Sequence, residues 1–77
     1  MAKSEIKNQI RRLRFENGEM TQQQLADKAG VTRQTILAIE ADKYSPSLIL
    51  AFRIAKAFNV PLEEVFQYEQ NDLQPPR

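Results

Sequence analysis

The sequence predicts an all-α domain of about five short helices. Three observations lead to this expectation. Apolar residues recur at spacings of three and four in several segments, as one face of a helix requires. Residues that cap or end helices, chiefly Gly, Asn, Pro, Ser and Thr, separate these segments at short intervals. The alternation of apolar and polar residues that indicates a strand is almost absent, and a chain of 77 residues has the length of one domain.

We expect the first helix to run from a cap at Ser4 to about Asn17. Its apolar stripe has helical spacing and consists of Ile6, Ile10 and Leu13. The Gly that follows Asn17 is a good helix stop, because Gly accepts the left-handed conformation of a C-cap. The arginines of this segment lie off the apolar stripe and are expected on a solvated face.

A second helix is expected to open at Thr21 and to end at Gly30. Thr21 and Gln24 have the spacing of a capping box, in which the Thr hydroxyl accepts from the N3 amide and the Gln side chain reaches back. A third helix is expected over residues 33–41, with Thr32 as its N-cap. Two short helices joined this tightly match the helix-turn-helix pattern, which we place at about residues 21–41.

The fourth helix is expected after a loop of residues 42–47, with Ser47 as its cap and Phe58 near its end. This segment is apolar nearly all round, so we expect most of it to be buried. A short fifth helix is expected from Leu62 to about Phe66, with two Glu in its first turn, where the helix dipole favours them. Residues 1–68 would then form the domain, and residues 69–77 a short polar C-terminal tail.

The third helix has two different faces when its residues are placed at 100° per residue. Ile36 and Ile39 lie on one side, and the opposite side carries Gln34, Leu37 and Ala38, with Arg33 at its edge. A helix fits the DNA major groove, where Arg can donate two N–H groups to guanine and Gln can pair with adenine. The apolar members can contact a thymine methyl group. The alternative is that this face is simply solvated.

Composition argues against an enzyme or a metalloprotein. The chain has 0 Cys and 0 His, no Gly-rich phosphate loop and no paired carboxylates at a plausible site, so we expect no catalysis and no cofactor. The net charge is only +1, but residues 1–58 carry 10 Lys and Arg against 6 Asp and Glu, so the body is basic and the end acidic. Without a membrane span or a signal segment, a cytoplasmic protein is expected.

The stretch "MTQQQLADKAGVTRQTILAIEADKYSPSLILAFRIAKAFNVPLEEVF" resembles the lambda-repressor-like helix-turn-helix family, the Cro/Xre type of prokaryotic regulator. The resemblance covers about residues 5–68 and rests on an ordered set rather than on one dipeptide: Thr21-Gln22, Leu25-Ala26, Gly30-Val31, Ile36, Ile39-Glu40, Pro46, Ile54-Ala55 and the closing "EEVF". It implies a five-helix domain that binds operator DNA, usually as a two-fold dimer. The function expected from it is sequence-specific DNA binding in transcription regulation.

The resemblance also implies roles for particular residues. The positions implied to meet bases or nearby phosphates are Arg33, Gln34, Thr35 and Ala38, and Leu37 is added because it lies on the same outward side of the third helix. Contacts with the DNA backbone are expected from Gln22, Thr32, Lys43, Tyr44 and Ser45. An internal ion pair between the first and third helices is implied for Arg14 and Glu40. Asp42 stands where the family commonly has Gly.

One recognition helix reads too few base pairs to select a site in a genome, so we expect a homodimer on a palindromic operator. The expected interface is the fifth helix and the segment after it, with Phe66 and Tyr68 as anchors and Ile49 as an edge contact. A monomer that pairs only on DNA is one alternative, and Ile49 is then an isolated exposed apolar residue. The other is an antitoxin-like or adaptor module that uses the same fold to bind a protein.

Overall fold

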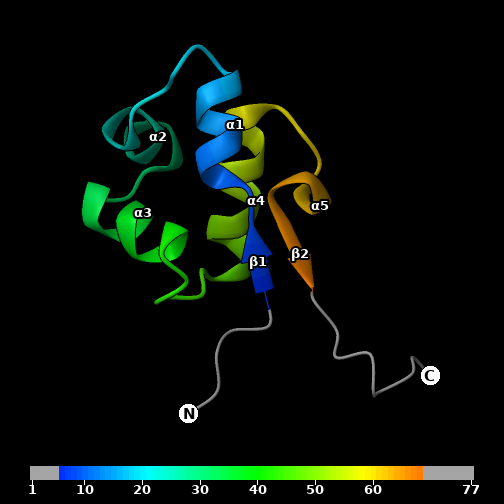
Figure 1. Ribbon diagram of the computed structural model, residues 1–77. Coiled ribbons are helices and arrows are strands. Elements are labelled where there is room, and N and C mark those ends of the chain that lie inside the picture. The colour runs from blue at the N-terminus through cyan, green and yellow to red at the C-terminus, as the bar shows by residue number, and fades with distance from the viewer. Residues whose placement is uncertain (1–5, 69–77) are drawn as a thin grey trace, which may run out of the picture.

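The computed structural model describes residues 6–68, so the expected cap Ser4 and the predicted tail, residues 69–77, lie outside the described residues. Within this range, α2 and α3 lie on one side of α1 and α4, while α5 and a two-stranded ribbon lie on the other (Figure 1). The elements follow in the order β1 (Ile6–Asn8), α1 (Ile10–Glu16), α2 (Gln22–Ala29), α3 (Arg33–Glu40), α4 (Leu48–Phe58), α5 (Leu62–Val65) and β2 (Phe66–Tyr68).

The ribbon corrects the all-α prediction, which is right for the five helices and wrong at both ends of the described chain. β1 pairs antiparallel with β2, with Ile6 opposite Tyr68 and Asn8 opposite Phe66. The first helix therefore begins at Ile10 rather than near Ser4, while the fifth ends at Val65, within one residue of the expected end near Phe66. Strands of three residues are too short for their alternation to be recognised in the sequence. Each strand also depends on hydrogen bonds to the other, which lies far away along the chain.

The helix ends of the central region have the expected local chemistry. Both hydrogen bonds of the Thr21 capping box are present, and Gly30 ends α2 in the left-handed conformation at φ 76°. The hydroxyls of Thr32 and Ser47 each accept a backbone N–H in the first turn of α3 and α4. These caps satisfy N–H groups that a helix start leaves without a partner, so they fix where each helix begins.

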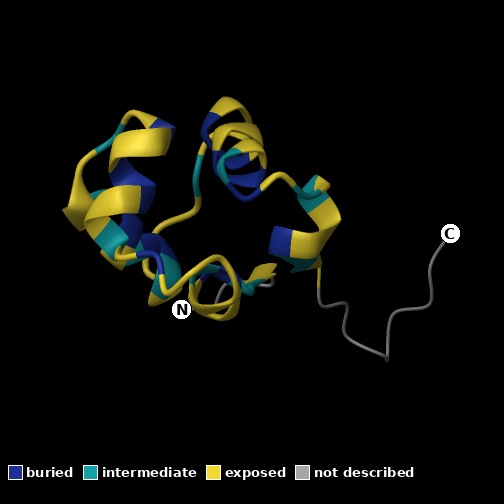
Figure 2. Cartoon of the chain, turned by 90° about the horizontal axis from the view of Figure 1, so that it is seen from above, coloured by how far each residue is buried: buried dark blue, intermediate teal, exposed yellow. Residues whose placement is uncertain are grey.

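The hydrophobic core lies between the helices, whose buried faces point inward (Figure 2). Its fully buried large side chains come from every helix: Ile10, Leu25, Ile36, Ile39, Ile54 and Val65. The prediction that most of α4 is buried is wrong for Leu48 and Phe52 in its first turns, which are 70% and 53% exposed, whereas Ile49, expected to be exposed, is 62% exposed. The reason is that α4 packs against α2 and α5 through the face of Leu50, Ala51, Ile54, Ala55 and Phe58.

The buried residues of the described part of the chain are all apolar. No polar or charged residue among residues 6–68 falls in the buried class. In the same range, no group of three or more His, Cys, Asp or Glu side chains is placed to hold a metal ion. No helix there combines the length and the apolar character that a membrane crossing requires.

Candidate nucleic-acid interface

The connection between α2 and α3 holds the two helices at a tight corner. Gly30 and Val31 both donate backbone N–H groups to the carbonyl of Ala26, over 2.8 and 3.0 Å. Gly30 has a φ of 76°, which Gly adopts readily because it has no Cβ, whereas other residues would be strained there. Thr32 then caps α3 by accepting from the N–H of Thr35 at 3.2 Å. So short a joint between two helices is typical of a helix-turn-helix.

The two faces of α3 are exposed as the angular argument predicts. Ile36 is fully buried and Ile39 is 2% exposed, so the helix is anchored through one side. Arg33, Gln34 and Leu37 are exposed, whereas the expected contacts Thr35 and Ala38 are half-buried. The Thr35 hydroxyl also lies 3.0 Å from that of Thr32, so it contributes to the cap. The outward face at the start of α3 therefore presents one guanidinium, one amide and one apolar side chain.

The residues expected at the DNA backbone lie in two places. Gln22 begins α2 and is half-buried, and its Nε2 donates to Glu40 Oε1 over 3.3 Å. Lys43, Tyr44 and Ser45 are exposed in the loop that follows α3. The N–H of Lys43 donates to the carbonyl of Ala38 at 2.9 Å, which folds the start of this loop back on the helix. Asp42, where the family commonly has Gly, adopts the left-handed conformation at φ 62°.

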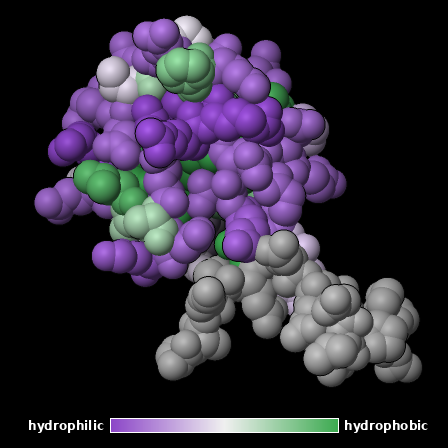
Figure 3. All heavy atoms as spheres, viewed as in Figure 1, coloured by the Kyte–Doolittle hydropathy of each residue, from purple (hydrophilic) through white to green (hydrophobic). Residues whose placement is uncertain are grey.

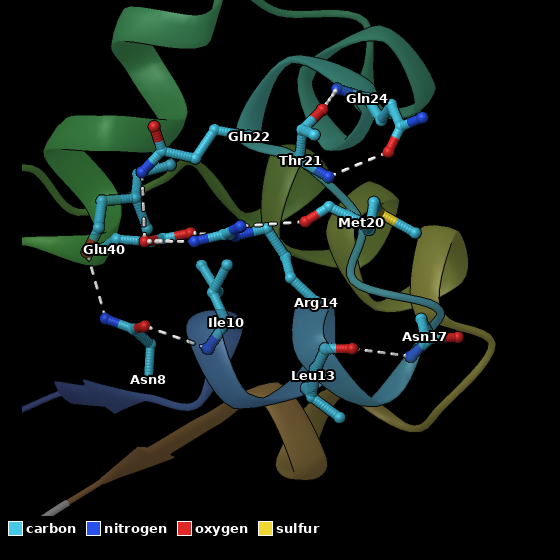
Figure 4. Close-up of polar contacts among 11 residues, drawn as sticks. Asn8, Ile10, Leu13, Arg14, Asn17, Met20, Thr21, Gln22, Gln24 and Glu40 are labelled. Carbon is cyan, nitrogen blue, oxygen red and sulfur yellow. Dashed lines mark hydrogen bonds and ion pairs between the residues drawn. The ribbon is translucent and has the colours of Figure 1, made fainter.

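Arg14 and Glu40 form the centre of a network that joins three helices (Figure 4). Arg14 Nε lies 2.7 Å from Glu40 Oε2, and the two side chains are 17% and 12% exposed. Arg14 Nη2 lies 3.3 Å from Glu40 Oε1, and its Nη1 donates to the carbonyl of Met20 at 2.9 Å. The resemblance implies the pair, but the links to Gln22 and Met20 were not predicted. They tie the start of α2 to the end of α3 through one carboxylate.

Sequence reasoning missed Asn8. Its Oδ1 accepts from the N–H of Ile10 at 3.1 Å, and its Nδ2 donates to the carbonyl of Ile39 at 3.0 Å and to Asp42 Oδ1 at 3.1 Å. Asn8 was expected inside the first helix, and the N-cap of α1 is Gln9, so no cap signal marks Asn8. Asn side chains do bond to the backbone two residues further on, which is a local signal for the contact with Ile10. The contacts with Ile39 and Asp42, 31 and 34 residues away, could not be predicted from the sequence.

The residues expected at a dimer interface differ in exposure. Tyr68 and Ile49 are 63% and 62% exposed, while Phe66 is half-buried and packs against the core. Leu48 and Phe52 add exposed apolar surface beside Ile49 on α4, although most of this helix was expected to be buried. The face seen in Figure 3 is mostly hydrophilic, and hydrophobic residues appear there only as small separate patches.

A bundle of five short helices that contains one tightly joined pair is typical of helix-turn-helix domains. The sequence model of the helix-turn-helix family matches residues 10–65. This chain belongs to that family, of the lambda-repressor-like, Cro/C1 type. The match begins at the first residue of α1 and ends at the last residue of α5, so the β1–β2 ribbon lies outside it.

Curated relatives align with most of this chain. An uncharacterized HTH-type transcriptional regulator of Methanocaldococcus jannaschii is 58% identical over 53 residues, which cover 69% of this chain and 80% of the relative. One of Methanothermobacter thermautotrophicus is 51% identical over 63 residues, covering 80% and 90%. The uncharacterized HTH-type transcriptional regulator YgzD of Bacillus subtilis is 45% identical over 67 residues, covering 87% of this chain and all of the relative.

Proposed function

We propose that this chain is a sequence-specific DNA-binding transcriptional regulator, acting in the cytoplasm through a domain of residues 1–68. The observation that carries the proposal is the outward face of α3, held by two buried isoleucines behind it. In this role α2 and α3 are the helix-turn-helix, and α3 lies in the major groove. The base-reading residues are Arg33, Gln34, Thr35, Leu37 and Ala38. Those on the phosphate backbone are Gln22, Thr32, Lys43, Tyr44 and Ser45.

Enrichment of bound sequences from a pool of random duplex DNA tests this function. The parent protein is expected to enrich one short pattern, because each well-placed bidentate contact discriminates against wrong bases by about 1–3 kcal/mol. An Arg33→Ala variant run in parallel is expected to lose the preference at one position of that pattern. Recovery of unselected DNA by the parent would show that α3 does not read sequence.

The proposed active form is a homodimer on a palindrome, with half-sites about one helical turn, or 34 Å, apart. Exposed apolar side chains support it, since Leu48, Ile49 and Phe52 are close in sequence on the first turns of α4 and Tyr68 lies on β2, and exposed apolar patches commonly mark interaction sites. The anchors we propose are Phe66 and Tyr68, with Ile49 at the edge. Of the three, Tyr68 and Ile49 have most of their surface available to a partner.

The same exposed residues of α4 favour a second candidate, an antitoxin-like or adaptor module whose main partner is another protein. The two functions differ in which surface they need. If Arg33→Ala abolishes DNA binding and leaves protein association unchanged, α3 serves DNA. If instead the protein binds no DNA and associates with a partner through Ile49 and Phe52, the adaptor function is correct.

A further inference from the structure

Asn8 lies where three parts of the chain meet. It is the last residue of β1 and pairs with Phe66 of β2, so its backbone belongs to the ribbon. Its carboxamide oxygen accepts from the N–H of Ile10 in the first turn of α1. Its side-chain Nδ2 donates at the C-terminal end of α3, to the Ile39 carbonyl at 3.0 Å and to Asp42 Oδ1 at 3.1 Å. Figure 4 draws Asn8 between Ile10 and the end of α3.

The turn that Asn8 holds leads directly into the proposed backbone-contacting loop. The Ile39 carbonyl also accepts from the N–H of Asp42 at 3.0 Å, and the N–H of Lys43 donates to the Ala38 carbonyl at 2.9 Å. Asp42 has a φ of 62°, the left-handed conformation, which Asp adopts less readily than Gly. The turn thus contains a left-handed residue whose side chain accepts a hydrogen bond from outside the helix, from the Asn8 amide.

This contact is a short link between the ribbon and the recognition helix. The ribbon carries the proposed dimer anchors Phe66 and Tyr68, and Asn8 is opposite Phe66 in the register. Hydrogen bonds to base edges tolerate only a few tenths of an ångström, so the orientation of α3 relative to the rest of the dimer decides whether both copies engage at once. A residue that fixes the end of α3 to the ribbon therefore influences DNA recognition without touching DNA.

We propose that Asn8 is a positioning residue for DNA binding, which sets the end of α3 and the loop of Lys43 against the β1–β2 ribbon. The inference rests on the proposed function, since it concerns how well α3 is presented to DNA. It differs from a role in folding alone, because the side chain holds a surface turn. Its loss is expected to alter specific binding more than the stability of the domain.

Asn8→Asp is the decisive variant. It keeps the size of the side chain and the oxygen that accepts from Ile10, removes both N–H donors, and sets a carboxylate against Asp42. We expect about a tenfold loss of affinity for the duplex enriched by the parent, the effect of losing one to two hydrogen bonds. Affinity for a random duplex is expected to fall less. By NMR, the amides of Asp42 and Lys43 are expected to exchange with solvent faster than in the parent.

A rescue and a control separate positioning from stability. The double variant Asn8→Asp, Asp42→Asn sets an amide against the new carboxylate, restores a hydrogen bond, and is expected to recover part of the lost affinity. Leu13→Val removes one methylene from the core in α1, away from the end of α3, and serves as a control with lowered melting temperature. It is expected to bind the enriched duplex as the parent does at a temperature where it is folded.

The outcomes separate the inferred role of Asn8 from the proposed DNA-binding function. If the parent enriches no sequence from random DNA, the proposed function fails and the role of Asn8 in it fails as well. If the parent enriches a sequence but Asn8→Asp binds it no worse than Leu13→Val does, only the inference about Asn8 is wrong. The same holds if the double variant gains nothing over the single one, or if the amide exchange of Asp42 and Lys43 is unchanged.

Discussion

At the scale of single residues, some side chains of α3 anchor the helix in the core and others are exposed to solvent. Ile36 and Ile39 lose almost all contact with water, while Arg33 and Gln34 keep theirs. The two polar residues lie in the first turn, the part of a recognition helix that reaches furthest into a groove. Because they add nothing to the core, their replacement is expected to leave the fold intact and to report on binding alone.

Arg33→Ala and Gln34→Ala are each expected to weaken binding to the enriched duplex by about 1–3 kcal/mol and to relax the preference at one position. The reason is the loss of a bidentate contact with one base. Titration of matched and single-substituted duplexes measures both effects. Arg11→Ala, which removes an exposed arginine from α1, is the charge-matched control and is expected to retain the preference. Variants that bind every duplex as the parent does would disprove the assignment of α3.

Lys43→Ala is expected to weaken binding to all sequences alike. Lys43 is exposed in the loop after α3, and a lysine on a phosphate releases about one counterion when it binds. The slope of log K against log salt is therefore expected to become shallower by about 1 unit. Lys56→Ala, an exposed lysine on α4, is expected to leave the slope almost unchanged. An effect of Lys43→Ala on one sequence only would mean that it reads a base.

Gln22→Ala is expected to weaken binding to all duplexes as well, but with little change in the salt slope, because the amide carries no charge. Its Nε2 donates to Glu40, which leaves a second N–H of the same amide for a phosphate oxygen. Affinity measured across a salt series tests this. A slope that falls as much as with Lys43→Ala, or an unchanged affinity, would exclude the phosphate contact.

At the scale of elements, the carboxylate of Glu40 joins α2 and α3 to α1. Glu40 at the end of α3 contacts Arg14 of α1 and Gln22 of α2, and Arg14 continues to the Met20 carbonyl. The pair is mostly but not fully removed from solvent, at 17% and 12% exposure. Its contribution is therefore expected between that of an exposed ion pair and that of a buried one.

Arg14→Ala and Glu40→Ala are each expected to lower the free energy of unfolding by about 2–3 kcal/mol, between the limits for exposed and buried pairs. The double variant is expected to lose less than the sum of the two, since either single change already breaks the contact. Denaturant unfolding of the four proteins measures the cycle. The exposed pair Arg12–Glu16, at 3.0 Å within α1, is the matched control, with a coupling expected near 0.3–0.5 kcal/mol, roughly that of a surface helix pair. Additive losses at Arg14 and Glu40 would show that their contact contributes nothing.

At the scale of the whole molecule, the ribbon brings the two ends of the described chain to one edge (Figure 1). It places Tyr68 opposite Ile6 and leaves Tyr68 largely exposed. The first turns of α4 expose Leu48, Ile49 and Phe52. None of these residues belongs to α3, so the proposed dimer interface leaves the outward face of α3 to the proposed contact with DNA.

Sedimentation without DNA at micromolar concentration is expected to show a dimer, because both sets of apolar residues gain by leaving water. Tyr68→Ala is expected to shift the protein towards monomer. Phe66→Ala is expected to do so together with a loss of stability, since Phe66 also packs on the core. Leu37→Ala, an exposed apolar residue on α3, is the control and is expected to stay dimeric. A parent monomer would exclude a preformed dimer, and a dimer that survives the Tyr68 and Phe66 variants would exclude this interface.

What the sequence determined by itself is the local order of the chain: five helices, their caps at Thr21, Thr32 and Ser47, and the two faces of α3. Caps and helical periodicity act between residues three or four apart, so they can be read along the chain. The tertiary structure alone decided the β1–β2 ribbon, the exposure of the first turns of α4, and the contacts of Asn8 and Gln22. Each of these depends on which distant segment lies alongside, and such a partner is chosen by the packing of the whole core rather than by neighbours in sequence.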